Sequence, residues 1–384
     1  MRELEVIANE IERLRARGQP AVLATVVGVK GSAYRLPGAR MLVTEKEWVA
    51  GSISGGCLEG DVVLRSSDVI SKKEAAVVTY DTTSDEDILF GIGLGCRGVI
   101  TVLIEPVPVH PRSPDLMEFI KSSLDRRQTG VVATVVRVEG GLAAKPGSRL
   151  TMRANGERAT DIGDTALISA ITAHIERNPS AENALTPFAV PNGTAEVFIE
   201  SIRLPRPLIV FGAGHDAMPI VRLAKEIGWR VTVVDHRPAY ATTARFPLAD
   251  EVLLSTREGL PPQMSFDSDT LALIMTHNYL RDLNLLKILL PSPVCYIGLL
   301  GPQKRADELL AELKKQGIEV TADALGRLYA PVGLDIGSEG PEGVALSIIA
   351  EMQAVIANHA GGHLRERRAP IHSPEAAAQG VRST

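Results

Sequence analysis

The chain has 384 residues and a net charge of −5, from 41 Lys and Arg residues against 46 Asp and Glu residues. At roughly 100–200 residues per domain, this length corresponds to two or three domains, each large enough to bury a core. The 45% of apolar and 23% of charged residues are typical of a soluble globular protein, and this charge balance gives no reason to expect a nucleic-acid partner. The three cysteines include no CxxC pair, which excludes iron–sulfur clusters and a large redox enzyme with several metal centres. Because no apolar run reaches the roughly 20 residues that span a bilayer, and the N-terminus is no secretory signal, we expect a cytoplasmic protein that does not enter a membrane.

An internal repeat organises the first half of the chain. Residues 22–40 read VLATVVGVKGSAYRLPGAR and residues 131–149 read VVATVVRVEGGLAAKPGSR, at a constant offset of 109. Each copy is a β-branched run followed by a glycine turn and a PG-x-R turn into another strand. We therefore expect an N-terminal domain over 1–202 that holds two related β-rich units, 1–110 and 111–202. Ten of the nineteen positions recur unchanged: Val22, Ala24, Thr25, Val26, Val27, Val29, Gly31, Pro37, Gly38 and Arg40.

The C-terminal half has a different pattern, in which short apolar strands alternate with helices. A Pro-rich linker, IRLPRP, precedes it at 202–207. The alternation predicts an α/β fold, with a Rossmann-like doubly wound parallel sheet over 203–360 behind the β-rich duplicated domain. The polar segment 361–384 is expected to be a disordered tail. The predicted strands are Leu208–Phe211, Arg230–Val234, Val252–Leu254, Leu271–Met275 and Val294–Leu299, and the predicted helices cover 215–227, 280–290, 303–316 and 342–358.

A glycine loop follows the first of these strands and opens a helix, as GxGxxG/A does in dinucleotide-binding folds. Gly212 allows the tight turn, Gly214 lets a phosphate approach the backbone, and the helix N-terminus attracts an anion. Asp235 ends the next strand 23 residues after Gly212, where an acid that binds ribose is expected. The same glycine turn also serves helix–strand packing alone, so both interpretations stay open.

Histidines lie at the strand ends where ligands of open α/β sheets bind. His215 lies in the glycine loop and His277 follows the strand that ends at Met275. We expect both to converge with Asp235 and Asp282 on a ligand. Each is otherwise a hydrogen-bonded structural histidine, and no HxH or HxxxH spacing indicates a metal site.

The first repeat carries a cysteine loop that the second has lost. Residues 51–59 read GSISGGCLE, whereas the aligned residues 160–168 read TDIGDTALI. Gly55 and Gly56 permit unusual backbone geometry and an anion nest, and the helix that follows favours a thiolate at Cys57. A thiolate there ligates a soft metal or relays sulfur. Glu59 suits either a catalytic role or the helix dipole, and a buried inert thiol is the structural alternative.

A second glycine-rich loop, GIGLGCRG at 91–98, holds Cys96 and Arg97. Arg97 is a candidate ligand for a phosphate or an oxyanion. Cys295 lies in an apolar strand and is expected to belong to the core. The chain has no G-x-S-x-G elbow and no GxxxxGK[ST] loop, which argues against serine hydrolysis and nucleotide hydrolysis.

These motifs together resemble the xanthine dehydrogenase accessory family of the XdhC/CoxI type. The resemblance runs from about residue 10 to residue 358, and the most specific stretches are GGCLEGD and PVGLDIG. Departures are Arg97, Asn278 and the GPEG sequence at 340–343. The other matching stretches are GSAYRLPGARMLV, GIGLGCRGVITVLIEP, FGAGHDAMPIVRLA, VTVVDHRP, RFPLAD, MTHNYLRD and YIGLLGPQKR.

The resemblance implies a maturation factor for a molybdenum hydroxylase of the xanthine or carbon monoxide dehydrogenase type. Such a factor binds the molybdenum cofactor, a molybdopterin that also occurs in a dinucleotide form. It holds the cofactor while a cysteine desulfurase supplies sulfur, and then inserts it into the apo molybdenum hydroxylase. The family cysteines fall on Cys57, as the thiol at the metal, and on Cys96. The resemblance also implies a homodimer, and a carrier or chaperone more than a catalyst.

Two alternatives remain from the residues alone. The glycine loop with Asp235 is compatible with an NAD(P)-binding oxidoreductase. The same features are compatible with a protein–protein adaptor whose nucleotide site is vestigial.

Overall fold

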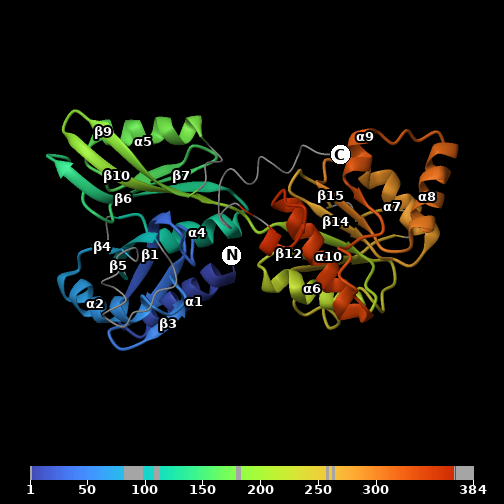
Figure 1. The fold of residues 1–384 in the computed structure, drawn as a ribbon, viewed down its shortest axis with the longest axis horizontal. Helices are drawn as coiled ribbons and strands as arrows, with labels where there is room; N and C mark the ends of the chain where they lie inside the picture. Colours follow the sequence, from blue (N-terminus) through green and yellow to red (C-terminus); the bar gives the residue numbers. More distant parts are fainter. Residues whose placement is uncertain are drawn as a thin grey trace. The chain divides into compact units, whose positions relative to one another are not determined.

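A computed structural model describes residues 2–81, 98–107, 113–178, 183–256, 259–261, 264–366 and 368. The chain divides into two compact units, residues 3–204 and 205–384 (Figure 1). Each unit has its own sheets and its own hydrophobic cores. The predicted fold class is confirmed: antiparallel sheets build the first unit and a parallel sheet builds the second. No helix in the described ranges is both long and apolar enough to cross a membrane.

The first unit contains two five-stranded antiparallel sheets of identical topology. Their strand orders are β3-β2-β1-β5-β4 and β8-β7-β6-β10-β9. The offset of 109 residues persists in the ladders, because Thr25 pairs with Arg40 and Thr134 pairs with Arg149. The strands are β1 (Ala21–Gly31), β2 (Arg40–Val43), β3 (Trp48–Gly51), β4 (Ala76–Asp81), β5 (Gly98–Val107), β6 (Gly130–Gly140), β7 (Arg149–Arg153), β8 (Arg158–Thr160), β9 (Ala184–Val190) and β10 (Gly193–Ile202).

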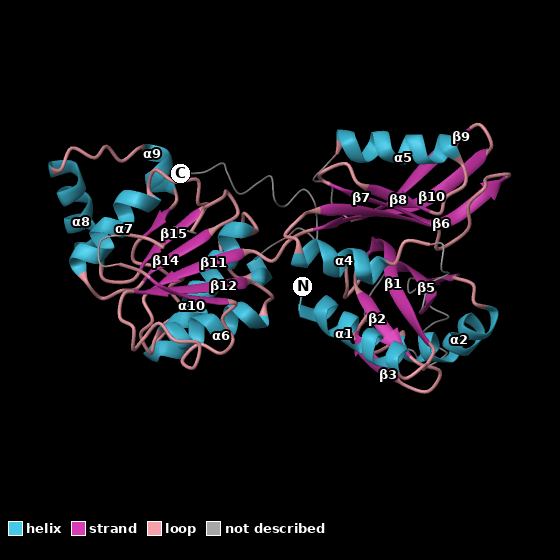
Figure 2. Cartoon of the chain, turned by 180° about the vertical axis from the view of Figure 1, so that it is seen from behind, coloured by secondary structure: helices cyan, strands magenta, loops and turns pink. Residues whose placement is uncertain are grey.

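The two sheets face each other and carry helices on their outer faces. Alternation along β1 sends Val26 toward α2 and Val27 toward the other sheet, where Val27 packs with Phe198. In the second copy α5 lies along the outer face of the sheet (Figure 2). The equivalent helices α1 and α4 share one core beside the two sheets. The helices are α1 (Arg2–Ala16), α2 (Glu59–Lys72), α4 (Leu116–Asp125) and α5 (Thr165–Arg177).

Two buried ion pairs cross between the repeats in a reciprocal manner. Arg40 of the first copy pairs with Glu200 of the second through both guanidinium Nη atoms, Nη1 lying 2.8 Å from Oε1. Arg149, the equivalent of Arg40, pairs with Glu105 of the first copy. The two arginine side chains are each 1% exposed. Since a buried charge without a partner is very costly, these pairs fix how the two repeats pack.

The second unit is a six-stranded parallel sheet of order β13-β12-β11-β14-β15-β16 with helices on both faces. One face packs against α6 and α10, and the other packs against α7 and α8 (Figure 2). The strand predicted to start at Val294 begins at Tyr296, and the short α9 and β16 were not predicted. The elements are β11 (Pro207–Phe211), α6 (Ala217–Glu226), β12 (Arg230–Asp235), β13 (Glu251–Leu254), β14 (Leu271–Ile274), α7 (Tyr279–Leu289), β15 (Tyr296–Leu299), α8 (Gln303–Lys315), α9 (Ala322–Gly326), β16 (Leu328–Tyr329) and α10 (Gly340–Ile356), followed by the 3-10 turn η1 (Leu364–Glu366).

Candidate functional site

The thiol of Cys57 is exposed, in a loop that joins β3 to α2. Gly55 and Gly56 are exposed beside it, and Gly56 adopts a φ of 114°, which is open to glycine and strained for other residues. A Cβ on Gly55 would lie 3.8 Å from the ring of Tyr34, itself 68% exposed. The loop therefore presents its sulfur to solvent next to an accessible aromatic ring.

The hydroxyl of buried Ser54 holds the cysteine loop from inside. Ser54 Oγ accepts hydrogen bonds from the backbone N–H groups of Gly56 at 3.2 Å, Cys57 at 3.1 Å and Leu58 at 3.1 Å. The Cys57 Sγ lies 3.4 Å from the same oxygen and donates to it. The anion nest expected from the two glycines is therefore not formed by these three N–H groups, since they bind Ser54 instead.

Glu59 is the second internal support of this loop, and only 3% of it is exposed. Its Oε1 accepts from Ser52 Oγ at 3.1 Å, from Ile53 N at 3.2 Å and from Ser54 N at 2.8 Å. Its Oε2 accepts from the Ser54 hydroxyl and from Leu58 N. Burial alone would raise the pKa of Glu59, but these hydrogen bonds, led by the one from the Ser54 side chain, hold it below its ordinary value. Glu59 is thus an ionised, fully hydrogen-bonded carboxylate that faces the loop.

Cys295 differs from Cys57 in its surroundings. Cys96 and Arg97 lie outside the described residues. Cys295 is half-buried just before β15, where its Sγ donates to the carbonyl of Thr270 at 3.4 Å and burial raises its pKa. Within the described ranges, no group of three or more His, Cys, Asp or Glu side chains is arranged to hold a metal ion. The role of Cys57 as a metal ligand remains a prediction.

The glycine loop of the second unit lies between β11 and α6, as predicted. Gly212 has a φ of 120°, and a Cβ there would lie 2.4 Å from the Met275 carbonyl oxygen, so no other residue fits. A Cβ on Gly214 would lie 2.3 Å from Oδ1 of Asp216. The Asp216 carboxylate therefore rests against the backbone that was expected to admit a phosphate, and it must rotate before an anion binds there.

Asp235 ends β12, but both oxygens of its carboxylate already accept hydrogen bonds from the protein. Oδ2 accepts from Ala213 N and from Arg237 Nη2, both at 2.7 Å, and Oδ1 accepts from Arg237 N at 2.8 Å and Nε at 3.0 Å. Burial opposes ionisation of Asp235, yet the bonds from Arg237 and Ala213 lower its pKa well below the ordinary value. A ribose hydroxyl has to compete with these donors, and Asp235 anchors the glycine loop whether or not it binds ribose.

The two predicted histidines are exposed at the same edge of the sheet. His277 has a φ of 55°, a left-handed conformation that is uncommon outside glycine, and its Nε2 lies 2.7 Å from Asp216 Oδ2. The structure thus links His277 to the glycine loop through Asp216. For the side chain of His215 no hydrogen bond is found among the described residues.

Sequence reasoning missed two arginines at this edge. Arg245 Nη2 donates to the Ala213 carbonyl at 3.4 Å, while its buried Nε has no hydrogen-bond partner in the part of the chain that is described. The Arg237 and Arg245 guanidinium groups lie 3.9 and 4.9 Å from the ring centre of Tyr240. Arg281 donates to Ser255 Oγ at 3.0 Å. Both missed residues lie in motifs that carried the family resemblance, RFPLAD and MTHNYLRD, and both follow strand ends, where ligands bind.

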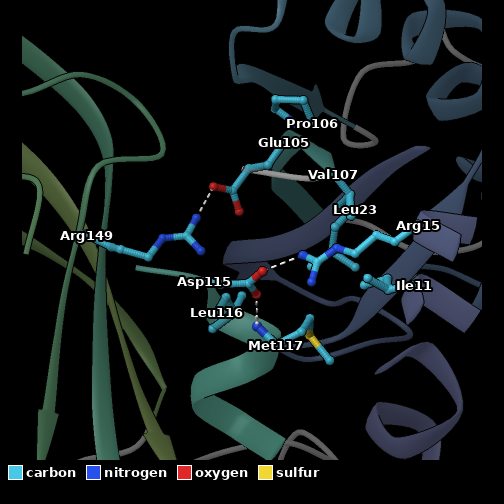
Figure 3. A pocket seen from close by; sticks show the side chains of 10 residues that line it. All are labelled: Ile11, Arg15, Leu23, Glu105, Pro106, Val107, Asp115, Leu116, Met117 and Arg149. Atoms are coloured by element: carbon cyan, nitrogen blue, oxygen red, sulfur yellow. Dashed lines mark hydrogen bonds and ion pairs between the residues drawn. The ribbon is translucent and has the colours of Figure 1, made fainter. Parts of the chain in front are cut away.

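A small pocket in the first unit is separate from these sites. It is bounded by α1, α4, β1, β5 and β7, and none of the predicted site residues lines it. Figure 3 shows the Arg149–Glu105 pair and the Arg15–Asp115 pair in its wall. Its polar groups hold the repeats together.

A duplicated sheet unit with one cysteine loop, followed by a Rossmann-like unit, defines a particular class of protein. Residues 14–81 and 123–177 match the profile of the XdhC and CoxI family, and residues 208–352 match that of the XdhC Rossmann domain. The chain belongs to the XdhC and CoxI family, which confirms the resemblance found in its motifs.

Individual relatives match along most of their length. A relative from Bacillus subtilis, described as a probable xanthine dehydrogenase subunit, is 35% identical over 335 residues, 87% of this chain and 92% of the relative. The "Molybdenum cofactor insertion chaperone PaoD" of Escherichia coli is 22% identical over 338 residues, 88% of this chain and 84% of the relative. A crystal structure described as a xanthine dehydrogenase from Bacillus halodurans has a TM-score of 0.71 and 29% identity, and covers 96% of this chain and 98% of its own.

Proposed function

We propose that this protein is a maturation factor that binds the molybdenum cofactor as cargo, holds it for sulfuration and inserts it into an apo molybdenum hydroxylase. The observation that carries the proposal is the exposed residue Cys57, held in a loop that accepts its support from buried Ser54. Membership of the XdhC and CoxI family and the similarity to a molybdenum cofactor insertion chaperone support it.

The cysteine loop suits the metal end of such a cargo. Sulfur is a soft ligand, and Cys57 is accessible to a large, planar molecule, as is the adjacent ring of Tyr34. Cys57 would hold the metal or pass sulfur to it, with a cysteine desulfurase as the donor.

The edge of the parallel sheet, taken by itself, suits a phosphate group. Arg237, Arg245 and Arg281 supply guanidinium groups beside the glycine loop, and arginine binds phosphate with paired hydrogen bonds. The buried Nε of Arg245, which has no partner among the described residues, is a donor that a phosphate oxygen would satisfy. These groups fit both the phosphate of molybdopterin and the pyrophosphate of its dinucleotide form.

The partners follow from this role. They are an apo molybdenum hydroxylase of the xanthine or carbon monoxide dehydrogenase type, a cysteine desulfurase, and a second copy of the chain in a homodimer. Glu59, a candidate catalytic group by its sequence position, instead supports the cysteine loop in this proposal, because both of its oxygens accept bonds from that loop.

The proposal is tested by direct binding of molybdenum cofactor to the purified full-length protein under anaerobic conditions. Molybdenum and pterin retained after gel filtration are measured for the wild type, Cys57→Ala and Cys295→Ala. We expect stoichiometric retention by the wild type and by Cys295→Ala, and an affinity reduced at least about tenfold in Cys57→Ala, equivalent to about 1.4 kcal/mol.

Other outcomes favour the alternatives. Binding of NAD(P)H with hydride transfer, without retention of molybdenum, would make the protein an oxidoreductase. Binding to the apo-hydroxylase with neither ligand retained would make it an adaptor. The engaged carboxylate of Asp235 disfavours the first of these, since a nicotinamide dinucleotide relies on a free acid at this position.

A further inference from the structure

The aligned segment of the second repeat can be compared directly with the cysteine loop of the first. The offset of 109 extends beyond the motif, because Met41 pairs with Gly51 and the equivalent Leu150 pairs with Thr160. At this offset Gly163, Ala166 and Ile168 occupy the positions of Ser54, Cys57 and Glu59. The second copy therefore lacks the serine, the glutamate and the cysteine together.

The helix after this loop begins at different points in the two copies. In the second copy α5 begins at Thr165, the equivalent of Gly56, and Asp164 caps it by accepting from Leu167 N at 2.9 Å. In the first copy α2 begins only at Glu59, three residues later in the alignment. An ordinary cap is thus sufficient to start the helix in this fold. In the first copy Gly56 has a φ of 114°, outside the helical range, and the Ser54 and Glu59 hydrogen bonds fall on the loop that stands in place of this first turn.

The hydroxyl proton of Ser54 determines what this serine offers to the thiol. A serine has one proton, and here it is donated to Oε2 of Glu59. The lone pairs of Oγ are left to accept from the loop N–H groups and from the thiol of Cys57. If Glu59 did not accept that proton, Ser54 would be free to donate it to the sulfur.

We infer that Ser54 and Glu59 are positioning residues for Cys57: Glu59 fixes Ser54 as an acceptor, and Ser54 holds residues 56–58 in a non-helical loop that presents the thiol. This inference rests on the proposed function for its biological role, since it deepens the account of the cargo thiol. The geometry that it assigns concerns the thiol itself and is measured without cargo.

The decisive variant is Glu59→Gln, which keeps the size of the side chain but replaces one of its two acceptor oxygens by an NH2 donor. Donors face both oxygens of Glu59, so either orientation of the amide disrupts the hydrogen bonds that orient Ser54. The Ser54 hydroxyl then loses its fixed orientation, and the thiol of Cys57 loses the oxygen to which it donates. Alkylation of Cys57 is followed by peptide mass spectrometry at one fixed pH. We expect the rate to rise at least about threefold, because a thiol that is no longer held by Ser54 is more open to the reagent.

Asp164→Ala is the control in the second repeat, because it removes a carboxylate that accepts from a backbone N–H at the start of the corresponding helix, in the copy that has no cysteine. It removes a hydrogen bond at the equivalent place in the fold but leaves the alkylation rate of Cys57 at the wild-type value. An unchanged rate in Glu59→Gln, or an equal change in Asp164→Ala, would overturn the inference. Ser54→Ala is expected to accelerate hydrogen exchange at Gly56, Cys57 and Leu58, whereas Ser54→Thr, which retains the hydroxyl, keeps the exchange slow.

Two further results keep the inference testable if a variant fails to fold or if no cargo binds. In the wild type the three loop amides are hydrogen-bonded to Ser54, so their unprotected exchange would also contradict the inference. If the wild type retains no molybdenum cofactor, the proposed function fails, while the alkylation rates still decide whether Ser54 and Glu59 position the thiol.

Discussion

Arg40 and Glu200 lie 160 residues apart in the chain and form a paired ion bridge in which the arginine side chain is 1% exposed. Loss of one partner leaves the other charge buried without compensation. We expect Arg40→Met to lower the free energy of unfolding of the N-terminal unit by about 3–5 kcal/mol. Urea denaturation followed by circular dichroism measures this change.

The double variant Arg40→Met with Glu200→Leu is the control for this prediction. It removes both charges, and replacement of a buried pair by apolar side chains of similar volume is often neutral. We expect most of the lost stability to return. Equal stability of the single and double variants would show that the pair does not compensate two desolvated charges.

The carboxylate of Asp235 makes the stability of the second unit depend on pH. Its pKa in the folded state is depressed below the unfolded value, so its contribution is complete above the unfolded pKa and is lost as pH falls through the folded one. We expect the midpoint of the unfolding transition of the second unit to decrease as the pH is lowered below about 5. In Asp235→Asn we expect this decrease to be less steep. Parallel pH curves for the two proteins would contradict this assignment.

Two glycines give opposite expectations for the same substitution. Gly212→Ala places a Cβ against the Met275 carbonyl and forces a strained φ, so we expect a loss of about 3 kcal/mol or more. Gly60→Ala lies in the exposed start of α2 with no atom within 4 Å of the new Cβ. There we expect a gain of about 0.5–1 kcal/mol, because alanine favours the helix. Thermal or urea unfolding of both variants checks the pair.

Arg245 tests whether the edge of the parallel sheet binds the phosphate of the cofactor. Arg245→Met removes a guanidinium whose buried Nε has no partner in the described structure, so we expect cofactor affinity to fall about tenfold while stability changes by no more than about 0.5 kcal/mol.

Arg327→Met is the structural counterpart of that substitution. Arg327 donates to the carbonyl oxygens of Leu290, Ser292 and Val294, so its loss leaves buried acceptors unsatisfied. We expect a loss of stability of about 2 kcal/mol and an unchanged cofactor affinity. Retained molybdenum and urea midpoints measured for both variants separate binding from folding.

Much of the fold was predictable from local sequence patterns. The repeat offset identified Arg40 and Arg149 as equivalent residues, and the β-branched and apolar runs with their glycine turns located the strands. The partners of these arginines could not be predicted from the sequence, because Glu200 and Glu105 come from the opposite repeat and contact the arginines only when the two sheets pack.

The candidate site was predictable at its backbone and not at its hydrogen bonds. Glycine spacing located the loops of Cys57 and Gly212, because φ angles and close backbone contacts restrict residue choice locally. The pattern did not reveal that Ser54 Oγ accepts hydrogen bonds from the loop N–H groups, nor that Arg237 donates hydrogen bonds to the carboxylate of Asp235. These contacts depend on side-chain rotamers and on which of several nearby donors lies closest.

The crossed ion pairs also have a consequence for how the N-terminal unit originated. Each repeat brings one guanidinium and one carboxylate, and each group is satisfied by the opposite repeat. Two separate, identical copies of one repeat would therefore satisfy both pairs across a twofold axis, as the surfaces of a symmetric homodimer do. The unit has the architecture of such a dimer with its two chains fused. Fusion allows the halves to diverge, so that one half keeps the exposed sulfur while the other serves as its framework.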